Sequence, residues 1–343
     1  LKAPPSAPPF PLPLDRIYVI IIGTTHEGKI LVESFFIALN AVLPLFLMMV
    51  AGFIVRICGI LNEASARQVN KLIFKVFLPL MVFINIYNSD LNADFSQNLL
   101  LFAAAGVLIE FLIGLVLVLL CEQENSRRGV MLQGMFRSNF VLYGIPISMA
   151  LFGSKAAGMA SLLIAVVIPM FNALAVLALE MFNGQRPSLW GVICGIITNP
   201  LILASAAGIA CNYFALRLPG VVYDTAGTLG GIATPLAFVV LGATLNFGET
   251  GRCVKPLLFT LCVKLIIFPI TFVFAAILLG FRGAELAVIL TVFGSPIAVS
   301  SFTMAQQMGG DEQLAGQLVV FSSVLSVGTM FLLIWGLRWL AYI

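Results

Sequence analysis

Apolar stretches of about 20 residues follow one another along almost the whole chain, and short polar segments separate them. A stretch of this length is what an α-helix needs to cross the hydrocarbon core of a bilayer. The alternating pattern of a transmembrane β-barrel is absent. The pattern predicts an all-α polytopic membrane protein with ten transmembrane helices, at residues 33–57, 66–88, 97–121, 127–151, 156–182, 188–214, 225–247, 254–279, 284–307 and 313–340.

Prolines at matching places divide these ten spans into two halves. Two pairs have the same separation and a third is close to it: Pro44 with Pro200 (200 − 44 = 156), Pro79 with Pro235 (235 − 79 = 156) and Pro146 with Pro296 (296 − 146 = 150). A five-helix unit ends on the opposite side of the membrane from its start, so a second such unit must be inverted. We therefore expect two inverted five-helix repeats, at residues 33–182 and 183–343, after a proline-rich, disordered leader at residues 1–32.

The fourth and the ninth predicted spans are each interrupted by glycine and proline. The broken stretches are Asn139-Phe-Val-Leu-Tyr-Gly144-Ile-Pro146-Ile147 and Phe293-Gly294-Ser295-Pro296-Ile297, at corresponding places in the two halves. Lipid cannot satisfy the free N–H and C=O groups of broken backbone, so a break at membrane depth must be buried or line a cavity. Ordinary proline kinks are the alternative. A matched pair favours the substrate site of a secondary transporter, at which the two broken spans cross.

Side chains near the first break are candidates for binding an anion. Asn139 can donate N–H groups to a carboxylate, and Arg137 can balance its negative charge. The half-helix N-termini created by a break favour anions as well. We interpret two further amides, Asn172 and Asn199, as residues that join helices.

Hydroxyl groups accompany the second break. Ser295, Ser300 and Ser301 lie in it or just after it and are candidate donors to a substrate. A serine hydroxyl bonded back to its own helix is the equal alternative.

Two further ionisable residues, Glu110 and Lys264, lie inside the third and the eighth predicted spans. They occupy nearly equivalent places in the two halves, since 264 − 110 = 154. A charge inside the membrane is costly unless it is paired, so both are functional candidates for charge balance or for carrying a coupling proton. A structural ion pair, or a side chain that extends to the interface, is the alternative.

Composition agrees with a carrier rather than an enzyme. The chain is 61% hydrophobic and 10% charged, and its net charge of +3 gives no sign of a nucleic-acid partner. Hydrolytic and nucleotide-binding motifs are missing. The one histidine, His26, and six cysteines without a C-x-x-C pair argue against catalysis and metal binding. We expect no cofactor and no metal site.

Basic residues in the short connections predict an orientation. The face reached after odd-numbered spans carries nine of them, and the other face carries four: Arg56, Arg67, Lys71, Lys75, Arg127, Arg128, Arg186, Arg252 and Lys255, against Lys155, Arg217, Arg282 and Arg338. The positive-inside rule then places the first face in the cytoplasm and both termini outside. We expect a multi-pass protein of the plasma membrane, the inner membrane of a bacterium.

Three segments resemble the auxin efflux carrier family, also called the PIN-like transporters. They are Phe136-Arg-Ser-Asn139-Phe-Val-Leu-Tyr-Gly144-Ile-Pro146, Ser295-Pro296-Ile-Ala-Val-Ser-Ser301-Phe-Thr-Met-Ala305-Gln-Gln-Met and Ala38-Leu-Asn40-Ala-Val-Leu-Pro44. The first two resemble the family's two crossovers, and the third resembles the start of its bacterial members. Plant carriers have a lysine where this chain has Gln306, and many have a long loop between the fifth and sixth spans. Both differences indicate a bacterial-type member.

The resemblance implies a scaffold of spans 1, 2, 6 and 7 and a mobile transport domain of spans 3–5 and 8–10. It also implies a homodimer, an elevator motion, and export or exchange of organic anions, here a small carboxylate such as malate or malonate. The family's crossover asparagine maps onto Asn139 and its prolines onto Pro146 and Pro296. A sodium-coupled symporter of the bile-acid type or a cation/proton antiporter is the alternative and needs acidic residues in the breaks. A receptor without transport and an intramembrane enzyme are further alternatives.

Overall fold

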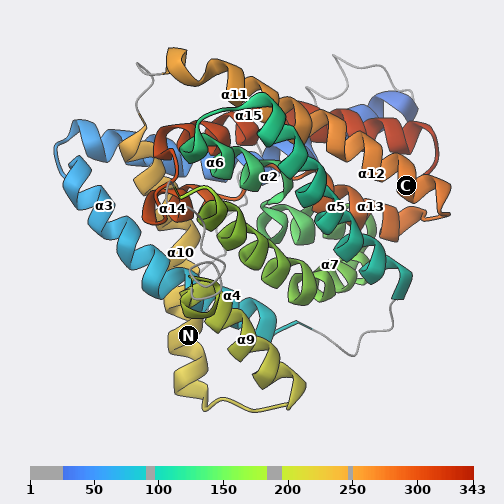
Figure 1. Cartoon of the computed structure of the whole chain (residues 1–343). Helices are drawn as coiled ribbons and strands as arrows, with labels where there is room; N and C mark the ends of the chain where they lie inside the picture. Colours follow the sequence, from blue (N-terminus) through green and yellow to red (C-terminus); the bar gives the residue numbers. More distant parts are fainter. Residues whose placement is uncertain (1–25, 90–96, 184–194, 246–249) are drawn as a thin grey trace, which may run out of the picture.

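The computed structural model describes residues 26–89, 97–183, 195–245 and 250–343, drawn as ribbons in Figure 1. Helices make up nearly all of these residues, and one isolated antiparallel bridge joins Ser138 to Ile297. In chain order the elements are α2 (His26–Ile57), α3 (Glu63–Leu72), η1 (Ile73–Phe77), α4 (Leu78–Tyr87), α5 (Gln97–Cys121), α6 (Asn125–Phe136), α7 (Phe140–Met181), α9 (Pro200–Tyr213), α10 (Gly220–Thr244), α11 (Thr250–Cys262), η3 (Val263–Ile267), α12 (Phe268–Leu278), α13 (Gly283–Gly294), α14 (Ser300–Gln307) and α15 (Glu312–Trp339).

Seven stretches of helix in the described residues are long and apolar enough to cross a bilayer. They are Phe35–Ile57, Glu63–Tyr87, Gln97–Cys121, Gly158–Met181, Gly220–Thr244, Cys253–Leu278 and Glu312–Trp339. Three shorter apolar helices, Phe140–Gly153, Pro200–Tyr213 and Gly283–Gly294, overlap the predicted fourth, sixth and ninth spans. The prediction of an all-α polytopic membrane protein is confirmed. The count of ten spans and the inverted repeat stay predictions.

The first helix begins earlier than the sequence pattern indicated. Helix α2 starts at His26, so the last residues of the expected disordered leader, 26–32, are helical. The apolar residues Ile30, Leu31 and Val32 continue the helix toward its N-terminus. The rest of the predicted leader lies outside the described residues.

The first break lies at Arg137–Asn139, where the predicted broken stretch 139–147 begins, and the prediction that Gly144 and Pro146 interrupt the helix is wrong. Helix α6 ends directly before Arg137, whose backbone is extended (φ −79°, ψ 108°), and α7 begins directly after Asn139. Pro146 lies inside α7. The reason is that Ser138 and Asn139 are poor helix formers, whose side chains compete with the helical backbone. A proline inside a helix removes one backbone bond and can be accommodated as a kink.

The second break lies at the predicted place, between the end of α13 at Gly294 and the start of α14 at Ser300. Ser295 leaves the helix with an extended backbone (φ −64°, ψ 148°). A side chain at Gly294 would press against the sulfur of Met330 on α15, so the glycine lets α13 and α15 approach closely.

The two breaks lie against each other. The backbone N–H of Asn139 donates to the carbonyl of Pro296 over 2.7 Å, beside the bridge between Ser138 and Ile297. The N–H of Ile297 donates to the hydroxyl of Ser322 on α15 over 3.1 Å. Backbone groups freed by the breaks therefore find partners inside the protein, as a broken helix in a membrane requires.

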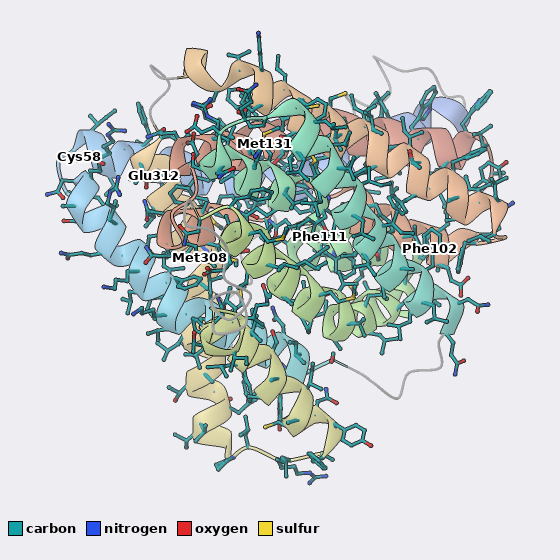
Figure 2. The ribbon with its side chains drawn as sticks, viewed as in Figure 1. Cys58, Phe102, Phe111, Met131, Met308 and Glu312 are labelled. Carbon is teal, nitrogen blue, oxygen red and sulfur yellow. The ribbon has the colours of Figure 1, made fainter. Side chains whose placement is uncertain are left out.

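The helices around this crossing fall on two sides of it. Helix α4 packs on α9 and α10, and these three lie together in the lower part of Figure 1. Helix α13 packs on α7 and α12, and α5 packs on α6 and α7. Helix α2 contacts both α10 and α15. In Figure 2 the buried side chains of Phe111 on α5 and Met131 on α6 lie among the helices on the other side of the crossing from α4, α9 and α10.

Reciprocal glycines bring α2 and α10 into close contact. A Cβ atom at Gly52 of α2 would overlap the carbonyl oxygen of Val239, and one at Gly242 of α10 would overlap that of Met49. Small residues at such crossings let helix backbones approach, which is a common way for membrane helices to associate.

We expect Gly242→Ala to destabilise the protein by about 1–3 kcal/mol, because the added methyl group forces the two backbones apart. Gly231→Ala on the same helix is the control, since a Cβ there meets no atom within 4 Å. Thermal unfolding of both variants in detergent checks this. Equal melting temperatures would show that the α2–α10 contact is looser than described.

Candidate functional site

A cavity of about 60 Å³ lies beside the crossing of the two breaks. Arg137, Ser138 and Asn139 of the first break form one wall together with Ser300 at the start of α14. Residues of α4, α9 and α10 form the opposite wall, which is mostly apolar and includes Asn85. Acidic side chains are absent from the described lining. The cavity therefore presents positive charge and hydrogen-bond donors.

Arg137 is buried without an acidic partner. One terminal nitrogen of its guanidinium donates to Oδ1 of Asn172 on α7 over 2.8 Å, and the other contacts the sulfur of Met304. Arg137 takes part in none of the ion pairs found in the described residues. Burying a charge without a counter-ion is strongly unfavourable, so a bound anion would be stabilised here.

Two donors in the cavity wall also lack partners. The side-chain nitrogen of Asn139 and the hydroxyl of Ser138 are buried and bond to no other described group. Buried polar groups are normally paired, and an unpaired one costs about 1–3 kcal/mol. A ligand with acceptor oxygens would satisfy both donors.

Two helix N-termini also meet at the cavity. Helix α7 begins at Phe140 and α14 at Ser300, and both residues line it. The first backbone N–H groups of a helix have no partner within it, and the helix dipole places partial positive charge at that end. Together with Arg137 they make the crossing suited to a carboxylate.

The other predicted site residues lie near the crossing but do not line the cavity. Gly144 is buried against the ring of Phe140, and Pro146 is exposed. The hydroxyl of Ser295 donates to the carbonyl of Thr291 on its own helix over 2.5 Å, which was the alternative stated above.

Ser301 is buried, and its hydroxyl is unpaired among the described groups. Gly294 and Pro296 shape the second break through the contacts given above.

Sequence reasoning gave Asn172 and Asn199 the same helix-joining role, whereas the structure gives them different roles. Asn199 accepts a bond from the backbone N–H of Leu201 over 2.9 Å and caps α9. Asn172, interpreted as a packing residue, instead lines the cavity and holds the guanidinium of Arg137. No local signal marks this role. The support of Ser322 for the second break was likewise missed.

Glu110 and Lys264 lie away from the cavity. Both side chains are fully buried, Glu110 on α5 and Lys264 in the π-helix η3. They interact with each other electrostatically. The ammonium group of Lys264 donates to the backbone carbonyl of Phe293 over 3.4 Å, close to the second break.

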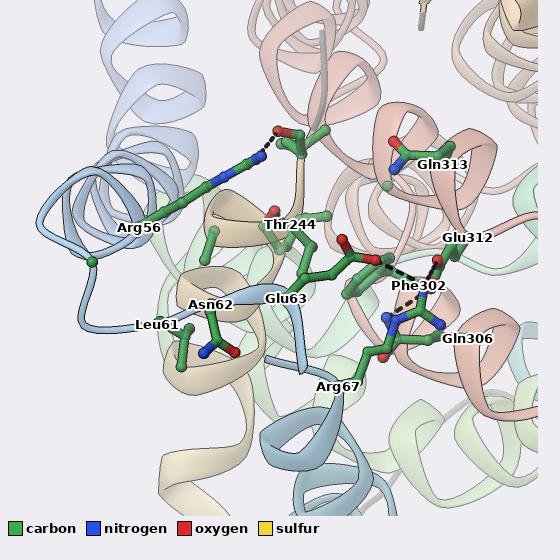
Figure 3. Close-up of a pocket in the computed structure, with 15 residues that line it drawn as sticks. Arg56, Leu61, Asn62, Glu63, Arg67, Thr244, Phe302, Gln306, Glu312 and Gln313 are labelled. Carbon is green, nitrogen blue, oxygen red and sulfur yellow. Dashed lines mark hydrogen bonds and ion pairs between the residues drawn. The ribbon is translucent and has the colours of Figure 1, made fainter. Parts of the chain in front are cut away.

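A second, larger cavity of about 460 Å³ lies where the ends of α2, α3, α10, α14 and α15 meet (Figure 3). Figure 3 shows Arg67 between Glu63 and Glu312. Arg67 pairs with Glu63 on its own helix over 3.1 Å and with Glu312 at the start of α15.

A chain of amides continues this contact. The side-chain nitrogen of Asn70 donates to Gln306 over 2.6 Å, and Gln306 donates to Glu312 over 2.8 Å. We call Arg67, Asn70, Gln306 and Glu312 the α3–α15 network. It joins α3 to α14 and α15, at the end of the molecule predicted to face the cytoplasm.

Comparison with known proteins shows that the chain is a membrane transporter. It belongs to the family described as "Membrane transport protein", an auxin efflux carrier-like family, whose profile matches residues 37–190 and 186–334. The predicted family resemblance is thereby confirmed.

Two relatives are similar over different lengths. An "Uncharacterized transporter" of Methanothermobacter thermautotrophicus is 24% identical over 303 residues, which cover 84% of this chain and 94% of that protein. A "Putative malonate transporter" of Rhizobium meliloti is 25% identical over 169 residues, 48% of this chain and 52% of that protein.

Proposed function

We propose that the protein is a secondary transporter that exports or exchanges small organic anions, with small carboxylates such as malonate as the substrate class. The observation that carries this proposal is Arg137, a buried cation without an acidic partner in a cavity whose described lining holds no acid. The name of the relative from Rhizobium meliloti supports the class. Exchange of labelled malonate across the membrane of proteoliposomes tests it.

The geometry suggests how a carboxylate binds. The planar guanidinium of Arg137 can hold one carboxylate through two parallel N–H···O bonds. The amide of Asn139 and the hydroxyl groups of Ser138 and Ser300 supply further donors, and the N-termini of α7 and α14 add partial positive charge. Asn172 holds the guanidinium in place and leaves its charge uncompensated.

The cavity must enlarge for a substrate to enter. Its volume of about 60 Å³ compares with about 300–1,000 Å³ for pockets that hold drug-sized ligands. Its two walls belong to different groups of helices. Arg137–Asn139 and Ser300 come with α6, α7 and α14, and the facing wall comes with α4, α9 and α10. Movement of one group against the other would therefore open the site.

An elevator motion is such a movement. In this proposal α2, α3, α4, α9 and α10 form the static scaffold, through which two copies of the chain form a homodimer. Helices α5–α7 and α11–α15 carry the crossing across the bilayer, the plasma membrane in this proposal. The alternative coupling to sodium needs acidic ligands, and the segments 137–139 and 295–299 contain none. Strict dependence of flux on sodium would reverse this preference.

We expect Asn139→Ala to weaken malonate binding tenfold to a hundredfold. A hydrogen bond to a charged group contributes about 1.5–3 kcal/mol, and each 1.4 kcal/mol is a factor of about ten. The KM for malonate in proteoliposomes measures the effect. Asn199→Ala is the control, because loss of the α9 cap lowers stability by about 1 kcal/mol and leaves KM unchanged. An unaltered KM for Asn139→Ala would remove this residue from the site.

A further inference from the structure

We propose that Glu110 and Lys264 form a proton-binding site, which takes up one proton when a dicarboxylate binds at the crossing and none when a monocarboxylate binds. This inference rests on the proposed function and deepens it, because it assigns the ion that accompanies the substrate.

The pair is not built like a structural salt bridge. Both side chains are fully buried, yet the ion pairs of the described residues do not include Glu110 with Lys264. Neither carboxylate oxygen of Glu110 has a hydrogen-bond partner in the described part of the chain. Buried ion pairs are favourable only when close contact and further hydrogen bonds compensate the loss of water. Without them, the charged form of Glu110 is held mainly by the charge of Lys264, so a further negative charge nearby can drive it to bind a proton.

Other charged groups do not replace this pair. The charge that interacts electrostatically with Glu110 is that of Lys264, and the converse holds for Lys264. The remaining charged side chains described on the helices that pack against α5 and η3 lie near the ends of those helices or, for Lys255, are exposed: Arg127 and Arg128 on α6, Glu180 on α7, Lys255 on α11, Glu285 on α13, and Glu312 and Arg338 on α15. Arg137, beside the break after α6, belongs to the substrate cavity.

A short physical path connects the pair to the crossing. Lys264 donates to the carbonyl of Phe293, and Pro296, three residues later, accepts the N–H of Asn139. On the other side, a Cβ atom at Gly106 of α5 would overlap the ring of Phe293. Both helices of the pair therefore contact the residue that leads into the second break. Lys264 also stands in a π-helix, and π-helical turns frequently occur at functional sites.

The balance of buried charge explains why a dicarboxylate would draw a proton. The buried residues with acidic, ammonium or guanidinium groups in the described part are Glu110, Arg137 and Lys264. Glu110 and Lys264 cancel, and Arg137 leaves one positive charge. A monocarboxylate neutralises that charge. A dicarboxylate leaves one negative charge in a low-dielectric interior, which a proton from water removes by forming the O–H bond of Glu110 while Lys264 stays an ammonium.

The test measures protons taken up per malonate bound. The purified full chain in detergent, in weakly buffered solution with a pH indicator, receives a pH-matched malonate solution, and equilibrium dialysis gives the bound amount. We expect about one proton per malonate and none per acetate. Glu110→Gln imitates the protonated side chain and should bind malonate without proton uptake. Glu285→Gln on α13 should behave like the unmodified protein.

If Glu110→Gln does not fold, a second variant tests whether Glu110 takes up the proton. The double substitution Glu110→Gln with Lys264→Gln leaves no uncompensated charge at the pair, and it should bind malonate more weakly and without a proton. Malonate binding without proton uptake by the unmodified chain would overturn this inference and leave the anion carrier standing. Proton uptake that persists in Glu110→Gln would also overturn it. Failure of every carboxylate to bind would overturn both proposals.

Discussion

Replacing Arg137 by alanine is expected to reduce malonate transport at least a hundredfold. The guanidinium is the buried cation of the cavity, and its acidic partner in our account is the substrate itself. Removing one member of a buried ion pair costs about 3–5 kcal/mol, and each 1.4 kcal/mol is a factor of about ten. Initial rates of labelled malonate uptake into proteoliposomes preloaded with malonate give the measurement.

Two further variants test whether the loss of transport is specific to the guanidinium of Arg137. Arg137→Lys keeps the charge but loses the paired donors of the guanidinium, so an intermediate rate is expected. Arg128→Ala removes an arginine from α6, the helix that ends directly before Arg137. The side chain of Arg128 bonds to the backbone carbonyl of Glu122 and to the side chain of Asn125, outside the cavity. The rate of this variant should stay close to that of the unmodified protein. Equal rates for Arg137→Ala and Arg128→Ala would contradict the assignment of the site.

Locking the α3–α15 network is expected to stop transport reversibly. Asn70 lies on the proposed scaffold and Gln306 on the proposed moving group, and their side chains are 2.6 Å apart. In a chain whose native cysteines are replaced by serine, Asn70→Cys with Gln306→Cys can be linked by a short bis-methanethiosulfonate, which forms a reducible disulfide with each cysteine. Flux should fall in proportion to the fraction linked and return after reduction, because the elevator motion separates these two residues.

A second linked pair serves as the control. Arg127 on α6 and Asp311 before α15 lie 3.2 Å apart, and both belong to the proposed moving group. Linking cysteines at these two positions should leave flux intact, since the group moves as one body. Full flux through the linked Asn70–Gln306 pair would contradict the division into scaffold and moving group.

The apolar pattern of the chain was enough to predict the helical architecture. Helix α5 begins and ends at the predicted residues 97 and 121, and the second break falls where Gly294 and Pro296 indicated. These features depend on local composition and length, which the sequence displays directly.

The first break could not be placed in the same way. Proline is the more conspicuous signal, yet Pro146 is helical and the chain opens at Ser138 and Asn139. Besides the low helix propensity of Ser138 and Asn139, a tertiary contact favours this position, the bond from the N–H of Asn139 to the carbonyl of Pro296 across the crossing. Local propensity competes with such contacts and does not contain them.

The hydrogen-bond partners of the site residues could not be predicted from the sequence either. Arg137 and Asn172 are 35 residues apart, and Ile297 and Ser322 are 25 residues apart. Polar residues of this kind commonly join membrane helices, so an amide or hydroxyl alone does not reveal which role it has. Only the fold shows that Asn172 supports the buried guanidinium and that Ser322 supports the second break.

Exchange of malonate across a sealed membrane is the most direct test of the central claim, that the crossing carries small carboxylates. Proteoliposomes are loaded with labelled malonate and diluted into medium with or without unlabelled malonate. The account predicts that external malonate accelerates release of the label and that Arg137→Ala abolishes the acceleration. Release that no external carboxylate accelerates, or acceleration that persists in Arg137→Ala, would contradict it.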